Sequence, residues 1–204
     1  MDEPGPFRYN GLMQDLLQEI SLLSSASATL DWDQETYAPS QSVAHRAKQL
    51  AYLQGRIHKL QTSGAFRDGL ASLDPANQRE LTHRYERATK LPQELVERDS
   101  ETSSLAKAAW SEAREKNEFS TFAPHLTKLL EIARVKADHW GFEDEPYDAL
   151  LAEYERGAKT REVAALFDSI DTELAQIAAA AVEASSSIPV DFLHGPAPLH
   201  AQQT

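Results

Sequence analysis

The 204-residue sequence contains no cysteine. This absence excludes disulfide bridges, thiolate zinc sites, iron–sulfur clusters and cysteine nucleophiles. A chain without cysteine also suits a reducing compartment, so we expect a cytoplasmic protein. The first six residues, MDEPGP, are acidic and carry no apolar core, so we do not expect a secretory signal at this end.

Positive charge is scarce as well. Lys and Arg total 20 against 32 Asp and Glu, which leaves a net charge of −12. Such a chain repels polyanions, so we expect no nucleic-acid partner and no anionic membrane partner. The most apolar run, Ile177–Val182, is mostly alanine and far shorter than the roughly 20 residues that span a membrane.

Glycine and proline are also few, with 8 and 10 residues, and long segments contain neither. Apolar residues recur at spacings of three and four along these segments, which is typical of helices with one buried face. The expected helices span residues 7–29, 40–62, 66–73, 75–91, 92–117, 121–140, 146–154 and 160–185. We expect Asp74 and Thr121 to cap helices and Gly141 to end one. The prediction is an all-α antiparallel array of six to eight helices without a sheet.

The composition changes after three consecutive serines at 185–187. Residues 188–204 contain three prolines and a glycine and show no helical periodicity. We therefore expect one helical domain over residues 1–187, followed by a linker over residues 188–204.

The segment Asp31-Trp32-Asp33-Gln34-Glu35 places acids at alternate positions. A calcium loop is a poor explanation, because the position that needs glycine holds Thr36 and the position that needs glutamate holds Ser42. Two interpretations remain. The acids cap the next helix or pair with arginines while Trp32 and Tyr37 anchor the segment in a core, or the segment faces a substrate.

Other catalytic patterns are missing from the 204 residues. None of the seven histidines lies in an HEXXH arrangement, and no glycine-rich phosphate loop or Ser-His-Asp constellation is recognisable. His139, followed by acids at 143–145, is better explained as a helix end than as a metal site. The basic group Arg79, Arg84, Arg87 and Lys90 alternates with glutamates, which favours a solvated face. Physical chemistry alone thus predicts a soluble helical domain without a visible catalytic centre.

Several stretches resemble the carboxypeptidase Taq family of metallocarboxypeptidases, in the family's order and over almost the whole chain. They are DWDQETYAP at 31–39, RAKQLA at 46–51, YERATKLP at 85–92, AWSEAR at 109–114, residues 119–124, PYDALL at 146–151 with EYE at 153–155, and residues 192–202. Ala38 stands where the family commonly has methionine, and Ser40-Gln41-Ser42 replaces a more glycine-rich step.

The resemblance implies a helical cytoplasmic exopeptidase, usually a homodimer, that removes C-terminal residues from peptides with one divalent metal, zinc or cobalt. In the family an HEXXH helix and a later glutamate hold the metal, and the motif glutamate activates water. None of these residues is present among the 204, so no catalytic and no metal residue is assigned. By resemblance, residues 1–187 correspond to a lid and wall over the substrate groove, and residues 188–204 lead toward the catalytic half. Asp33, Glu35 and Tyr37 are the candidate groove or lid-hinge residues.

Three hypotheses follow. The first is the non-catalytic helical half of a metallocarboxypeptidase, which is inactive alone. The second is a stand-alone helical module that binds itself or another helical protein through an unpartnered apolar stripe. The third is a distinct metal-dependent enzyme that uses the acids near Trp32.

Overall fold

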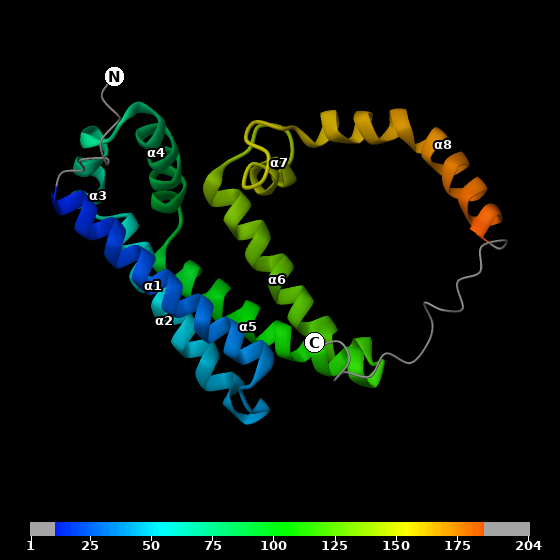
Figure 1. Cartoon of the computed structure of the whole chain (residues 1–204), viewed down its shortest axis with the longest axis horizontal. Helices are drawn as coiled ribbons and strands as arrows, with labels where there is room; N and C mark the ends of the chain where they lie inside the picture. Colours follow the sequence, from blue (N-terminus) through cyan, green and yellow to red (C-terminus); the bar gives the residue numbers. More distant parts are fainter. Residues whose placement is uncertain (1–10, 186–204) are drawn as a thin grey trace, which may run out of the picture. The chain divides into compact units, whose positions relative to one another are not determined.

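The computed structural model describes residues 11–185, which form eight α-helices and no strand (Figure 1). The helices are α1 Gly11–Thr36, α2 Val43–Gln61, α3 Gly64–Gly69, α4 Pro75–Lys90, α5 Gln93–Lys116, α6 Phe119–Trp140, α7 Pro146–Leu151 and α8 Thr160–Ser185. Two short 3₁₀ helices, η1 Ser40–Ser42 and η2 Leu70–Ser72, join them. The predicted all-α architecture is confirmed. The expected boundary at 187/188 and the linker 188–204 lie outside the described residues.

The chain divides into two compact units, Met1–Leu150 and Leu151–Thr204. The first unit contains α1 to α6 and nearly all of α7, and the second contains α8. Within residues 11–185, no helix combines the length and the hydrophobicity that crossing a membrane requires.

Helix α1 is longer at its C-terminal end than the expected helix, which stopped at Thr29. It continues to Thr36, so the acidic segment is helical rather than irregular. The backbone amides of Tyr37 and Ala38 both donate to Asp33 O, at 3.0 and 2.9 Å, and the helix ends there. The expected end was wrong because no helix-breaking residue occurs before Pro39, and because polar contacts to other helices, rather than an apolar stripe, fix these turns.

The predicted helix ends at Asp74 and Gly141 are confirmed. Asp74 accepts hydrogen bonds from the backbone amides of Ala76 and Asn77 at 3.1 and 3.2 Å, and Gly141 ends α6 with a φ of 82°. The predicted cap at Thr121 is wrong, because α6 already begins at Phe119. The α5–α6 turn is instead made by Asn117, whose φ of 54° is left-handed.

Two small apolar clusters stabilise the first unit. In the first cluster, Met13 of α1 and Phe66 of α3 are buried with Leu70 and Leu73. The ring of Phe66 stacks on that of Tyr85 in α4, with centroids 6.2 Å apart. The second cluster joins the end of α6 to α7 through Ala137, Trp140 and Ala149.

Between these clusters, α2 packs against α1 and α5, and α5 packs against α6. Small residues allow close approach: Ala47 and Ala51 are buried on α2, and a Cβ added to Gly55 would overlap the Glu97 side chain of α5. The α1–α2–α5 layer therefore combines close approach at small residues with buried apolar side chains such as Leu50, Ile57 and Leu95, and polar contacts add to it.

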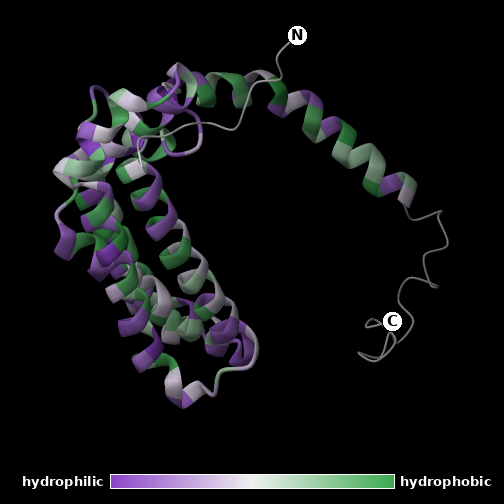
Figure 2. Ribbon diagram, turned by 60° about the vertical axis from the view of Figure 1, so that its left-hand side comes forward, coloured by the Kyte–Doolittle hydropathy of each residue, from purple (hydrophilic) through white to green (hydrophobic). Residues whose placement is uncertain are grey.

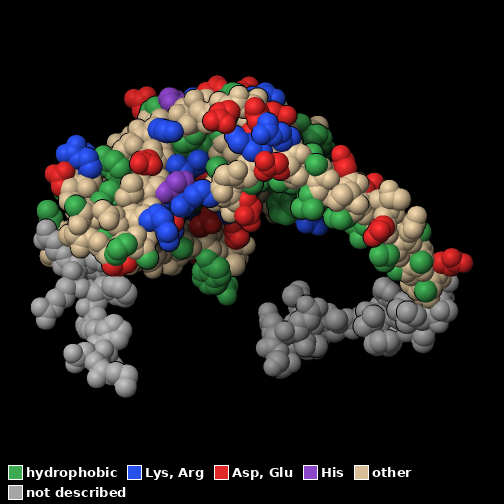
Figure 3. Space-filling model, turned by 90° about the horizontal axis from the view of Figure 1, so that it is seen from above, with side chains coloured by type: hydrophobic (Ala, Val, Ile, Leu, Met, Phe, Trp, Pro, Cys, Tyr) green, Lys and Arg blue, Asp and Glu red, His purple; other side chains and the backbone are tan. Residues whose placement is uncertain are grey.

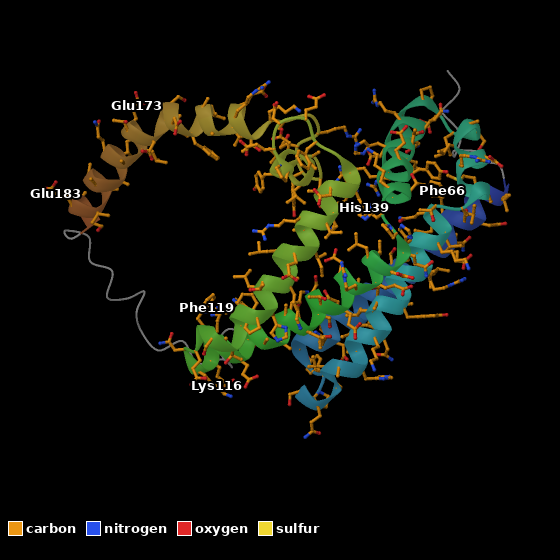
Figure 4. The ribbon with its side chains drawn as sticks, turned by 180° about the vertical axis from the view of Figure 1, so that it is seen from behind. Phe66, Lys116, Phe119, His139, Glu173 and Glu183 are labelled. Atoms are coloured by element: carbon orange, nitrogen blue, oxygen red, sulfur yellow. The ribbon has the colours of Figure 1, made fainter. Side chains whose placement is uncertain are left out.

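The first cluster provides a stability test. Phe66 is 2% exposed, and we expect Phe66→Ala to lower the free energy of unfolding by about 3–5 kcal/mol because it leaves a cavity. Phe119 undergoes the same chemical change at a site that is 65% exposed, and both residues are labelled in Figure 4. We expect Phe119→Ala to cost about 0.5 kcal/mol or less in urea unfolding. Equal losses for the two variants would contradict this core.

The Asp74 cap predicts a pH dependence. A side-chain hydrogen bond from Asn77, together with its backbone amide, lowers the pKa of Asp74 below its ordinary value of 3.8. Since the folded-state pKa is the lower one, the stabilisation is present above the ordinary pKa and is lost as pH falls through the folded value. We expect Asp74→Ala to lower the thermal midpoint at pH 7 and to have a smaller effect near about pH 2.5. Asp74→Asn should keep most of the cap, and a pH-independent loss in Asp74→Ala would refute this explanation.

Candidate functional site

The candidate residues Asp33 and Glu35 lie in the last two turns of α1, and Tyr37 follows that helix directly. Asp33 faces α2, where its carboxylate accepts a hydrogen bond from Arg46 Nη2 at 2.7 Å. Arg46 also donates from Nη1 to the Leu30 carbonyl at 3.0 Å, and its side chain is only 15% exposed. One guanidinium thus holds both a side chain and the backbone of α1.

Glu35 faces α5 together with Asp31, one helical turn earlier. Lys107 Nζ donates to Glu35 at 2.5 Å and to both Asp31 oxygens at 3.0 and 3.1 Å. Burial is the largest single influence on Lys107 and opposes its charge. Hydrogen bonds and attraction from Glu35 and Asp31 together outweigh burial, so the pKa of Lys107 is raised above its ordinary value.

Between the two ion-pair groups, Gln34 forms a reciprocal pair with Ser104 of α5. Gln34 Nε2 donates to the Ser104 carbonyl at 3.2 Å, and Ser104 Oγ donates to Gln34 Oε1 at 2.8 Å. Ser104 is buried, so this pair satisfies polar groups inside the helix layer. The sequence alone does not reveal Ser104 and Lys107, because both lie some 70 residues from their partners and no local spacing links them.

The aromatic residues of the segment lie at the surface. Trp32 is 57% exposed and Tyr37 is 77% exposed, and their rings meet edge to face with centroids 5.4 Å apart. The expectation that these rings anchor the segment in a core is wrong, because the ion pairs with α2 and α5 hold α1 instead. The expected pairing of the acids with arginine holds for Asp33, whereas Asp31 and Glu35 pair with a lysine.

A groove of about 460 Å³ lies beside this segment, between α1 and α5. Serine hydroxyls line both walls, from positions 24 and 27 of α1 and positions 100, 103 and 104 of α5. Leu50 and Gln54 of α2 also line the groove, and Asp31, Asp99 and Lys107 contribute charge. Gln54 Nε2 donates to Ser27 Oγ at 3.2 Å, so part of this polar lining is paired internally.

A family metal does not fit the described residues. Within residues 11–185, no three His, Asp or Glu side chains gather as a metal site would require. The candidate carboxylates Asp33 and Glu35 are engaged by Arg46 and Lys107. His139 is exposed in the last turn of α6 (Figure 4). No catalytic step is therefore derived through a metal at these residues.

The basic group on α4 has two roles. Arg84 pairs with Glu80 at 2.8 Å on the surface, as the predicted solvated face requires. Arg87 instead lies over the Trp140 ring, 3.8 Å from its centroid, and Lys90 Nζ donates to the Trp140 carbonyl at 2.8 Å. These two cations join α4 to the end of α6, so they are structural contacts rather than a binding patch.

Arg46 is the most testable contact of the site. Arg46→Ala removes two hydrogen bonds, one of them charged, from a largely buried guanidinium. We expect the free energy of unfolding to fall by about 1.5–3 kcal/mol. The matched control is Arg84→Ala, which breaks an exposed pair within one helix and should cost about 0.3–0.5 kcal/mol. If urea unfolding gives the two variants the same loss, Arg46 does not hold α1.

Comparison with known proteins agrees with this helical architecture. The family described as carboxypeptidase Taq (M32) metallopeptidase matches residues 12–204. Thermostable carboxypeptidase 1 of Pyrococcus furiosus is 33% identical over 169 residues, covering 77% of this chain and 33% of that protein. Carboxypeptidase 1 of Bacillus subtilis is also 33% identical, over 163 residues, covering 75% of this chain and 32% of that protein.

Solved structures show the same relationship. The crystal structure of BsuCP superposes with a TM-score of 0.74 at 29% identity, covering 79% of this chain and 35% of that one. Pyrococcus furiosus carboxypeptidase gives a TM-score of 0.63 at 31% identity, covering 83% and 37%. The chain spans about a third of the length of these relatives. On the match over residues 12–204, this chain belongs to the carboxypeptidase Taq (M32) metallopeptidase family.

Proposed function

We propose that these residues are the N-terminal helical portion of a metal-dependent carboxypeptidase that hydrolyses C-terminal residues from peptides. The observation that carries the proposal is the family match over residues 12–204. The relatives named above are carboxypeptidases, and about a third of their length is covered. The substrate we propose for the whole enzyme is therefore a peptide.

We further propose that the 204 residues are inactive alone. The sequence contains no HEXXH motif, and residues 11–185 contain no group of three metal-ligating side chains. The divalent metal, zinc or cobalt, would then be held by residues outside these 204. When bound, such a metal polarises the scissile carbonyl and lowers the pKa of its bound water.

The task we assign to this chain is to position a wall or lid of the substrate groove. Arg46 and Lys107 fix the last turns of α1 through Asp33 and Glu35, so these acids act as positioning residues. Tyr37 follows the fixed helix end and is 77% exposed, so its ring is available to contact a peptide. In this proposal Tyr37 faces the substrate groove of the whole enzyme, while Asp33 and Glu35 hold the end of α1 in place at the lid hinge.

The proposed setting is the cytoplasm, supported by the absence of cysteine. The proposed partners are a second copy in a homodimer or the catalytic half of the enzyme. The net charge of −12 argues against nucleic-acid and anionic membrane partners.

The alternative is a stand-alone helical module that binds or dimerises without catalysis. One observation favours it: no residue of α8 is buried, although the helix carries several large apolar side chains. An apolar face of this kind marks a contact surface in either hypothesis.

The proposal predicts that the purified 204-residue protein releases no amino acids from the C-termini of peptides, with or without added zinc or cobalt. Metal addition should also leave the thermal midpoint unchanged, because a metal stabilises a fold only through a specific site. Mass spectrometry of a peptide substrate and thermal unfolding measure the two outcomes. A full-length relative, such as the Bacillus subtilis enzyme, serves as the positive control for activity.

Release of C-terminal residues by a homogeneous sample would overturn the claim that the chain is inactive. A metal-dependent rise in the thermal midpoint that disappears in the double variant Asp33→Ala, Glu35→Ala would instead support a distinct metal site at the acids near Trp32. Absence of both effects supports the proposal that metal binding and catalysis belong to residues outside these 204.

A further inference from the structure

Helix α8 carries an apolar seam with a strict period. Spacings of four and three alternate without interruption through Val163, Phe167, Ile170, Leu174, Ile177, Ala181 and Ala184. This is the 3.5-residue repeat of the a and d positions in a coiled coil, over about 32 Å of helix. Figure 2 shows the hydrophobic colour recurring along α8.

The described residues of its own unit, 151–185, leave the seam uncovered. Its four large central residues are exposed by 60% (Phe167), 45% (Ile170), 57% (Leu174) and 65% (Ile177). Among the described residues of that unit, 151–185, α8 is the only complete helix. A single helix gains most of its stability from packing its apolar face, so this seam requires a partner helix.

The charges beside the seam select the partner. In coiled-coil terms, the e and g positions that flank the seam at its centre are Asp171 and Glu173. From Glu162 to Ser185 the helix contains five acids and no Lys or Arg. On the face of α8 seen in Figure 3, the coloured side chains are hydrophobic or acidic.

A second copy of α8 is a poor occupant, because from Glu162 to Ser185 it offers no Lys or Arg that could pair with Asp171 and Glu173, and each copy of the protein carries a net charge of −12. Lys or Arg at the flanks of the partner would instead pair with Asp171 and Glu173. The side chains of the seam also become smaller along the helix, from Phe167 and Leu174 to Ala181 and Ala184. The partner therefore needs small residues opposite the first half and larger ones opposite the second.

We propose that the α8 seam docks one helix from outside the 204 residues, with an apolar seam of its own that is flanked by lysine and arginine. This inference rests on the proposed function, in which that helix belongs to the catalytic part of the enzyme. The acids at 171 and 173 then select the partner, and the apolar positions supply the affinity.

The test uses two synthetic helical peptides that share one apolar heptad seam and differ only at the flanking positions, which are all lysine or all glutamate. Binding of each fluorescent peptide to the 204-residue protein is measured by anisotropy at physiological salt. We expect the lysine-flanked peptide to bind at least about tenfold more tightly, since 1.4 kcal/mol of charge complementarity corresponds to tenfold.

Two pairs of variants separate this docking from general attraction to an acidic protein. Asp171→Lys with Glu173→Lys should reverse the preference between the peptides, whereas Glu162→Lys with Asp168→Lys makes the same change in net charge away from the flanks and should keep the order. Ile177→Asp lies in the seam and should abolish binding, whereas Val182→Asp, at a residue 71% exposed outside the seam, should not. Circular dichroism checks that every variant keeps its helix content.

The inference fails if the wild-type chain binds both peptides equally, if the two charge variants behave alike, or if Ile177→Asp has no effect. Sedimentation showing a stable dimer that Ile177→Asp dissolves would identify a second copy as the occupant and would also overturn it. The peptidase assay reads out the proposed function separately. Release of amino acids would overturn the claim that the 204 residues are inactive alone, without changing the peptide preference.

Discussion

The largely buried guanidinium of Arg46 fixes how the first two helices of the first unit meet. It joins α2 to the end of α1 through the Leu30 carbonyl and the Asp33 carboxylate. A charge that is this poorly exposed is costly unless it is paired, so α2 and the last turns of α1 hold one another in place. Lys107 adds the corresponding link to α5 through Asp31 and Glu35. This ion pair is weaker than that of Arg46, because Lys107 is more exposed. The position of the exposed Trp32–Tyr37 pair follows from these links rather than from apolar packing around the rings.

Much of the fold is predictable from local chemistry. The three- and four-residue periodicity located the helices, and the Asp74-Pro75 step and Gly141 marked ends that the structure confirms. The predictions for the end of α1 and for the start of α6 were wrong. The last turns of α1 are held by a contact with Arg46, which lies on the next helix. Helix α6 begins earlier than predicted because Asn117 turns the chain in a left-handed conformation that no neighbouring residue requires.

The candidate site shows the same limit more clearly. The sequence showed that the acids of the segment Asp31–Glu35 needed partners, and it suggested arginine, which is correct for Asp33. It did not reveal Lys107, which lies 72 residues from Glu35, or the reciprocal pair between Gln34 and Ser104. A helical register can place two side chains on one face, but it does not specify which face of a distant helix will meet them. The burial expected of Trp32 and Tyr37 failed for the same reason, because their environment is set by helices that other residues orient.

The position of the excess acids says more about partners than their number does. Spread evenly, a net charge of −12 would say only that polyanions are repelled. Five of the acids, with no base, instead fall within the 24 residues from Glu162 to Ser185. Two of them, Asp171 and Glu173, flank an apolar seam that the described residues of its unit leave uncovered. Charges beside an apolar seam contribute less to affinity than to the choice of partner, because they penalise every partner of the same sign. An alanine-rich helix with a modest apolar face gains most from such selection, since apolar contact alone would distinguish little between one amphipathic helix and another. The first unit is stabilised by its own caps, cores and ion pairs, whereas α8 requires a complementary surface from outside the described residues of its unit.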